Sequence, residues 1–158
     1  MDLDLDGDMD IVVGSRGERR VLWLENVGEL NFFQHDINFS TSIEKDSWIT
    51  GFNMDYADLN GDGRLDIVSS VWPNSAYVLF QPKKPQDKWN IEKIGSIEPD
   101  LLVSVTLADI DGDGDEDIFS GSYSLGSRDV DDVDNINKSY GSVVWFENQG
   151  DKWIKNNI

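Results

Sequence analysis

The segment that decides the fold reads DLNGDGRLDIVSS over residues 58–70. Two other segments align with it without gaps: DLDLDGDMDIVVG over residues 2–14 and DIDGDGDEDIFSG over residues 109–121. The three copies start 56 and 51 residues apart. Self-similarity at a fixed period of this length is typical of repeat architectures. The sequence therefore predicts one structural unit that is repeated along the chain.

Other features keep the same register as these acidic motifs. An apolar segment follows each motif, and a second aromatic residue and a closing isoleucine come after that segment. The apolar segments cover residues 22–26, 78–81 and 144–148, and the closing isoleucines are Ile37, Ile94 and Ile158. The repeat thus extends well beyond the motif itself.

The apolar pattern predicts strands. Residues 52–57 and 103–108, which precede the second and third motifs, alternate with period two and contain aromatic and β-branched residues, as strands do. No stretch keeps apolar residues at helical spacing over several turns. Each full unit is therefore predicted to form four short strands, with the acidic motif as the turn between the first two.

Four antiparallel strands per repeat favour an all-β fold built of β-propeller blades, with a sandwich as the alternative. We expect a single propeller fragment over residues 1–158, with about three blades whose repeated aromatic residues pack between sheets. The expected blades are residues 1–38, residues 47–94 and residues 100–158, the last with an inserted loop at about residues 122–139. The first blade is expected to be incomplete, because Met1 stands in the place of Ala57 and Ala108.

Composition and charge exclude several classes of function. The chain has 13 Lys and Arg against 31 Asp and Glu, a formal net charge of −18, so nucleic acids and anionic membranes are repelled. Its hydrophobic content of 39%, with 6 Trp and 7 Phe, favours a folded domain over an acidic disordered tail. The absence of cysteine excludes disulfides and thiolate chemistry, and no apolar run is long enough for membrane insertion.

The spacing D-x-[DN]-x-D-G-x-x-D places side-chain oxygens at positions 1, 3, 5 and 9 and a backbone carbonyl at position 7. Glycine at position 6 permits the sharp turn that brings these oxygens onto one centre. The predicted side-chain ligands are Asp2, Asp4, Asp6, Asp10, Asp58, Asn60, Asp62, Asp66, Asp109, Asp111, Asp113 and Asp117. The predicted backbone ligands are the carbonyls of Asp8, Arg64 and Asp115.

Sites made only of oxygen favour Ca²⁺ over Zn²⁺, which prefers nitrogen or sulfur, and over Mg²⁺, which keeps more water. Position 12, which is Val13, Ser69 or Ser120 and not glutamate, argues against an EF-hand. A single copy leaves open a metal-free Asp/Gly-rich turn. However, 14 of the 31 acidic residues lie in the three motifs, and such crowding of like charges favours a bound cation. We expect up to three calcium ions, one in each turn.

The acidic motif, followed by DIV and then by WLEN or WFEN, resembles the FG-GAP/VCBS repeats of integrin-alpha-like β-propellers. The resemblance covers essentially the whole chain. It implies a Ca²⁺ between the two innermost strands of each blade and a ring of about seven blades. Three blades cannot close such a ring, so the resemblance implies a fragment that pairs with the rest of the propeller or with another copy of the chain. It also implies a location outside the cell or at its surface.

The leading functional hypothesis is a non-catalytic, calcium-binding module that binds a protein or a glycan. The alternative is the propeller part of a calcium-dependent polysaccharide lyase or sugar dehydratase, and a third possibility is a scaffold whose ligand site lies on other blades. The only histidine, His35, stands just before a closing isoleucine and near no nucleophile motif, so it is interpreted as a surface residue.

Three loops are weaker candidates for ligand contact. Arg16, Arg19 and Arg20 form the only dense positive cluster and suit either a carboxylated glycan or an ordinary hairpin tip. Trp72 beside Pro73 suits a sugar or the cover of an adjacent blade. The insertion contains Arg128, Asp129, Asp131, Asp132, Asp134 and Asn135. It suits a second metal site, a partner-binding loop or a solvated loop.

Overall fold

The computed structural model describes residues 1–15, 18, 20–39, 43, 47–98, 100–123 and 143–158. These residues form strands and turns, and no helix occurs among them. Accordingly, the described part of the chain contains no helix long and apolar enough to cross a membrane. The all-β prediction is confirmed.

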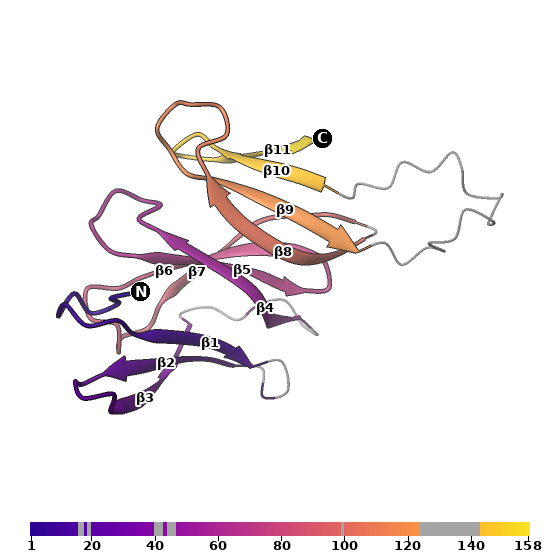
Figure 1. Ribbon diagram of the computed structural model, residues 1–158. Helices are drawn as coiled ribbons and strands as arrows, with labels where there is room; N and C mark the ends of the chain where they lie inside the picture. The colour runs from indigo at the N-terminus through magenta and orange to yellow at the C-terminus, as the bar shows by residue number, and fades with distance from the viewer. Residues whose placement is uncertain (16–17, 19, 40–42, 44–46, 99, 124–142) are drawn as a thin grey trace.

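Three antiparallel sheets follow one another along the chain and stack in chain order (Figure 1). The first sheet contains β1 (Ile11–Ser15), β2 (Arg20–Asn26) and β3 (Phe32–Ile37). The second contains β4 (Trp48–Ala57), β5 (Asp66–Trp72), β6 (Ser75–Phe80) and β7 (Asn90–Ser96). The third contains β8 (Leu101–Ala108), β9 (Asp117–Tyr123), β10 (Val143–Asn148) and β11 (Trp153–Asn157). Within each sheet, strands that follow one another in sequence are paired, which confirms the four-stranded antiparallel unit and the incomplete first one.

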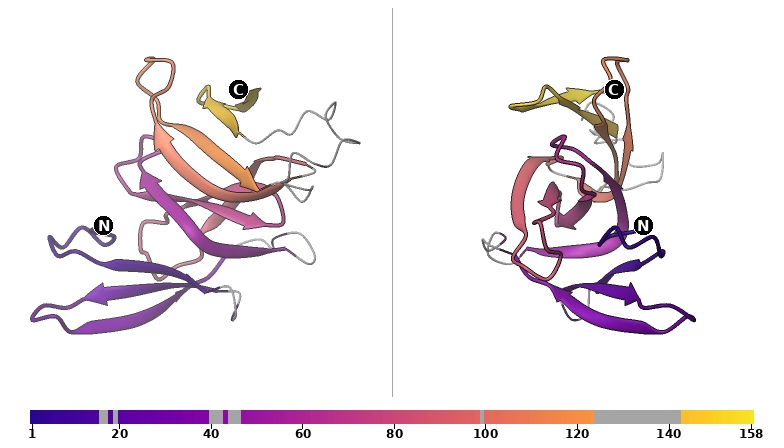
Figure 2. Two further views of the ribbon diagram at one scale, coloured as in Figure 1. Left: turned by 45° about the vertical axis from the view of Figure 1, so that its right-hand side comes forward. Right: turned by 90° about the vertical axis from the view of Figure 1, so that its left-hand side faces the viewer.

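The middle sheet is covered on both faces. On β5, Ile67 packs towards the first sheet and Val68 towards the third, and the first six residues of this strand are all buried. Burial on both faces accounts for the apolar and small residues of this strand, Ile67, Val68 and Val71 with Ser69 and Ser70 between them. In Figure 2 the second sheet lies between the first and the third in both views.

Large aromatic residues fill the two layers between the sheets. Trp23 and Trp89 are fully buried between the first and second sheets, and Phe146 is buried between the second and third. Gly95 on β7 permits a close approach there, because a Cβ atom at this position would lie 2.3 Å from the Phe146 ring. The expected packing of the repeated aromatics between sheets is observed at these residues.

Side chains of β4 also bond the backbone of β8. The Asn53 amide oxygen accepts the Val105 N–H at 3.3 Å. The Asp55 carboxylate accepts the Leu107 N–H and the Thr106 hydroxyl, both at 2.9 Å. These bonds join the first strands of the second and third sheets, so the acidic turns that follow them are held at a defined separation.

Candidate metal centre

The three acidic motifs form loops in equivalent places. Loop 1 (residues 2–10) leads into β1, loop 2 (residues 58–66) joins β4 to β5, and loop 3 (residues 109–117) joins β8 to β9. All three lie on the same side of the stacked sheets, at the left of Figure 1. The repeat in the sequence therefore becomes a row of acidic loops in space.

The aspartate at position 1 organises each loop from inside. In loop 2, the two Asp58 oxygens accept the N–H groups of Asp62 at 3.0 Å and Gly63 at 2.8 Å. Asp2 and Asp109 accept the corresponding glycine N–H groups at 3.0 and 3.1 Å. The position-6 glycines Gly7, Gly63 and Gly114 have φ values of 99°, 83° and 99°, a region that residues with a Cβ atom rarely adopt.

The residues at positions 3 and 5 turn their side chains towards the loop in the same way. In loop 2, the Asn60 oxygen accepts the Asp62 N–H at 3.0 Å, and Asp62 accepts the Arg64 N–H at 3.0 Å. The same pair of bonds occurs in loop 1, from Asp6 to Asp4 and from Asp8 to Asp6, and in loop 3, from Asp113 to Asp111 and from Asp115 to Asp113. These two-residue bonds are local turns that Asp and Asn favour.

The position-9 aspartates Asp10, Asp66 and Asp117 are buried and join two parts of each unit. One Asp66 oxygen accepts the Leu59 N–H in loop 2 at 3.1 Å, and the other accepts the Gln81 N–H after β6 at 2.9 Å. Asp10 and Asp117 make the same pair of bonds, with Asn26 and Asn148 as the distant donors. This second role was not predicted from the sequence, although an amide residue, Asn26, Gln81 or Asn148, ends each apolar segment and was a signal of it.

The structure brings predicted ligands together in two loops. Carboxylate oxygens of Asp2, Asp4 and Asp10 lie within 4.8 Å of one another, and those of Asp109, Asp111 and Asp113 do the same. The donors are all oxygen atoms, and this set fits a hard cation such as Ca²⁺. The backbone carbonyls of Asp8, Arg64 and Asp115 stay predictions.

The loops place carboxylates where their charge is unfavourable. Burial raises the pKa of Asp66 from 3.8 to about 6, and the nearby charges of Asp62 and Asp58 act in the same direction. Hydrogen bonds from the Gln81 and Leu59 amides oppose this rise in pKa. Desolvation also raises the pKa of Asp4 and of Asp111, and the charges of neighbouring carboxylates act in the same direction. A cation would relieve this crowding.

The metal-free protein is expected to be more stable at about pH 5 than at about pH 7.5. Because folding raises the Asp66 pKa above its unfolded value, the stability from this group is complete below the unfolded pKa and is lost as the pH rises through about 6. Between pH 5 and pH 7.5 the loss amounts to roughly 1–1.5 kcal/mol. Urea unfolding in chelator at several pH values measures it. Asp66→Asn is the control, and an equal pH dependence in that variant would contradict the assignment.

The other candidate loops are only partly described. Arg16, Arg19 and residues 124–142 lie outside the described residues, and Ser122 and Tyr123 belong to β9. Arg20 forms ion pairs with Glu18 and Asp36, so its charge is compensated within the chain.

Trp72 and His35 both stack on other aromatic residues. Trp72 stacks on Trp48 of its own sheet with ring centroids 5.4 Å apart. His35 stacks on Trp23 at 4.5 Å, and its Nε2 lies 2.5 Å from the Glu25 carboxylate.

Stacked antiparallel sheets, with a repeated acidic loop before the second strand of each full unit, define a β-propeller-like repeat module. The sequence model described as FG-GAP-like repeat matches residues 2–69 and 58–120, so the chain belongs to the FG-GAP-like repeat family. A search of curated proteins and a search of solved structures found no match.

Proposed function

We propose that this module binds Ca²⁺ in its acidic loops and belongs to the integrin-alpha-like type of propeller. The observation that carries the proposal is the same ordered set of oxygen donors in three successive units, each held by the same backbone N–H groups. Preordered oxygens of high charge are what calcium sites require. A turn that binds no metal does not need so many carboxylates. In this chain they contribute to a net charge of −18, which opposes compact folding by self-repulsion.

The residues at positions 1, 3, 5 and 9 of each loop would hold the ion. When bound, Ca²⁺ supplies positive charge and offsets the mutual repulsion of the carboxylates. Groups of the chain itself hold the loop in shape: the position-1 aspartates and position-6 glycines form the turn, and the position-9 aspartates connect it to the following strands. The proposed role of the ion is therefore structural.

We further propose that the module works outside the cell or at its surface and binds a protein or a glycan. Loops whose donors are mostly exposed bind calcium weakly, and extracellular modules function with sites of this kind. A panel of matrix proteins and glycans, screened with calcium and with chelator, tests this part. Binding that is equal in both conditions, or binding to none of them, contradicts it.

Calcium is expected to raise the melting temperature. One site at a hundredfold excess over its dissociation constant adds about 2.7 kcal/mol, which corresponds to roughly 8 °C in a domain of this size. Thermal unfolding in Ca²⁺, in Mg²⁺ and in chelator measures the effect, and Mg²⁺ is expected to give less. Asp111→Ala should reduce the rise, whereas Asp151→Ala, which removes an exposed carboxylate outside the loops, should not. The same melting temperature with calcium and with chelator would contradict the proposal.

A further inference from the structure

The three loops differ strongly in charge. Loop 1 carries five aspartates and loop 3 carries six acidic residues, whereas loop 2 carries three aspartates and one arginine, a formal charge of −2. Two replacements cause most of this difference: Asn60 stands at position 3 and Arg64 at position 7, where the other two loops have aspartates. Loop 2 therefore repels itself least.

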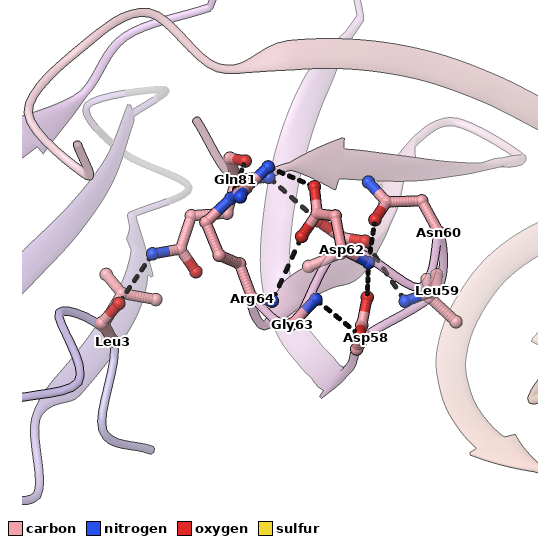
Figure 3. A network of polar contacts seen from close by, with 9 residues as sticks. Leu3, Asp58, Leu59, Asn60, Asp62, Gly63, Arg64 and Gln81 are labelled. Carbon is pink, nitrogen blue, oxygen red and sulfur yellow. Dashed lines mark hydrogen bonds and ion pairs between the residues drawn. The ribbon is translucent and has the colours of Figure 1, made fainter. Parts of the chain in front are cut away.

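Arg64 is held in place by contacts on two sides (Figure 3). Its guanidinium forms an ion pair with the Asp62 carboxylate, and its Nε donates to the Gln81 carbonyl at 3.0 Å. The other Asp62 oxygen accepts the backbone N–H of Arg64 at 3.0 Å. Both oxygens of this predicted ligand thus already have a donor from one residue, and the side chains of the pair are only 24% and 28% exposed.

The carboxylate geometry of the loops shows the same difference. Among the residues that the structure describes, groups of three carboxylates with oxygens within 4.8 Å of one another occur in loops 1 and 3 and not in loop 2. Loop 2 has an amide at position 3, and its Asp62 is paired with Arg64. Electrostatic attraction for a divalent cation is therefore lowest in the middle loop.

The Gln81 carbonyl that holds Arg64 belongs to a fixed part of the fold. The buried Gln81 side chain donates to the Leu3 carbonyl in loop 1 at 2.6 Å. Its counterparts Asn26 and Asn148 instead accept the N–H groups of Gly28 and Gly150 in their own turns. Arg64 is therefore attached to a residue that bridges the first and second sheets, and this anchoring makes its charge a permanent part of loop 2.

We propose that Arg64 is an internal counterion of loop 2, so that calcium fills loops 1 and 3 first and loop 2 last and most weakly. The inference rests on the proposed calcium binding. It predicts that the middle sheet keeps its loop folded at calcium concentrations that leave the outer two loops empty. The module then has two calcium-dependent ends around a centre that depends little on calcium.

The amides of Gly7, Gly63 and Gly114 report on the loops separately, because each donates to the position-1 aspartate of its own loop. A calcium titration of the ¹⁵N-labelled chain followed by NMR gives one midpoint per loop. In the unaltered protein, the Gly63 midpoint is expected at a calcium concentration roughly tenfold higher than the other two. This comparison needs no variant.

Arg64→Gln removes the guanidinium and is expected to lower the Gly63 midpoint by about tenfold while moving the other two by less than about threefold. Arg64→Lys keeps the charge and should leave Gly63 last. Lys152→Gln, which removes a positive charge outside the loops, should change no midpoint selectively. Equal midpoints in the unaltered protein, or a Gly63 midpoint that Arg64→Gln leaves unmoved, overturn the inference alone. The absence of any calcium-dependent shift at all three glycines overturns the proposed function itself.

Discussion

Asp117→Ala is expected to lower the free energy of unfolding by about 2–4 kcal/mol even in chelator. The Asp117 side chain is 1% exposed, and its two oxygens accept the N–H groups of Ile110 at 3.0 Å and of Asn148 at 2.8 Å. Alanine leaves both donors without this acceptor, and the Asn148 amide is buried. The calcium-dependent stabilisation of loop 3 should also be lost. Urea unfolding followed by tryptophan fluorescence, with calcium and with chelator, measures both effects.

The matched control for this variant is Asp115→Ala. Asp115 stands in the same loop and carries the same charge, but it is exposed. Its replacement is expected to change the stability in chelator by no more than about 0.5 kcal/mol. If the two variants unfold at the same urea concentration in chelator, Asp117 does not connect the loop to β10, and the buried hydrogen bonds carry little of the stability.

Trp23→Ala is expected to cost about 3–5 kcal/mol, because it empties the layer between the first and second sheets. Trp23 is fully buried there and packs in the same cluster as Trp89 and Leu79. A loss of this size is a large part of the 5–15 kcal/mol that holds a typical domain together. The first sheet should therefore detach or unfold before the remainder of the chain.

Trp23→Phe tests how much stability depends on the full volume of the Trp23 side chain. The Trp23 Nε1 atom is buried and has no hydrogen-bond partner among the described residues. Replacement by phenylalanine therefore breaks no hydrogen bond and removes only part of the side-chain volume. The expected loss in the free energy of unfolding falls to about 1–2 kcal/mol. Phe33→Ala, at an exposed ring of the same sheet, serves as the surface control. A Trp23→Ala variant as stable as Phe33→Ala would contradict the role of this layer.

Much of the fold was predictable because its determinants are close together in sequence. Alternation over residues 103–108 predicted β8, and the three aligned motifs predicted equivalent turns before β1, β5 and β9. The turns themselves depend on contacts over few residues: the Gly63 N–H reaches Asp58 across five positions, and the Asp62 N–H reaches Asn60 across two. Bonds of this length follow from local residue types.

The candidate site was predictable only in part. The sequence identifies the position-9 aspartate as a ligand, but its bond to the Gln81 or Asn148 amide depends on how later strands pair with β5 and β9. The same holds for Arg64, which the motif counts only as a backbone carbonyl. Its guanidinium could have pointed to solvent, but it pairs with Asp62 and its Nε donates to the Gln81 carbonyl, 17 residues further along the chain.

The repeat, the strands and the turn in each acidic motif follow from the sequence alone, because they depend on residue types within a few positions of one another. How each loop is attached to the rest of the fold depends instead on contacts between segments that lie far apart in the chain. Gln81 meets Leu3 across 78 residues of chain, and Asp55 meets Leu107 across 52. Such contacts form when whole sheets stack and exclude water from their shared layer. Asp66 and Arg64 are likewise held by Gln81, which lies 15 and 17 residues further along the chain, whereas the formal charge of each loop already follows from its residues.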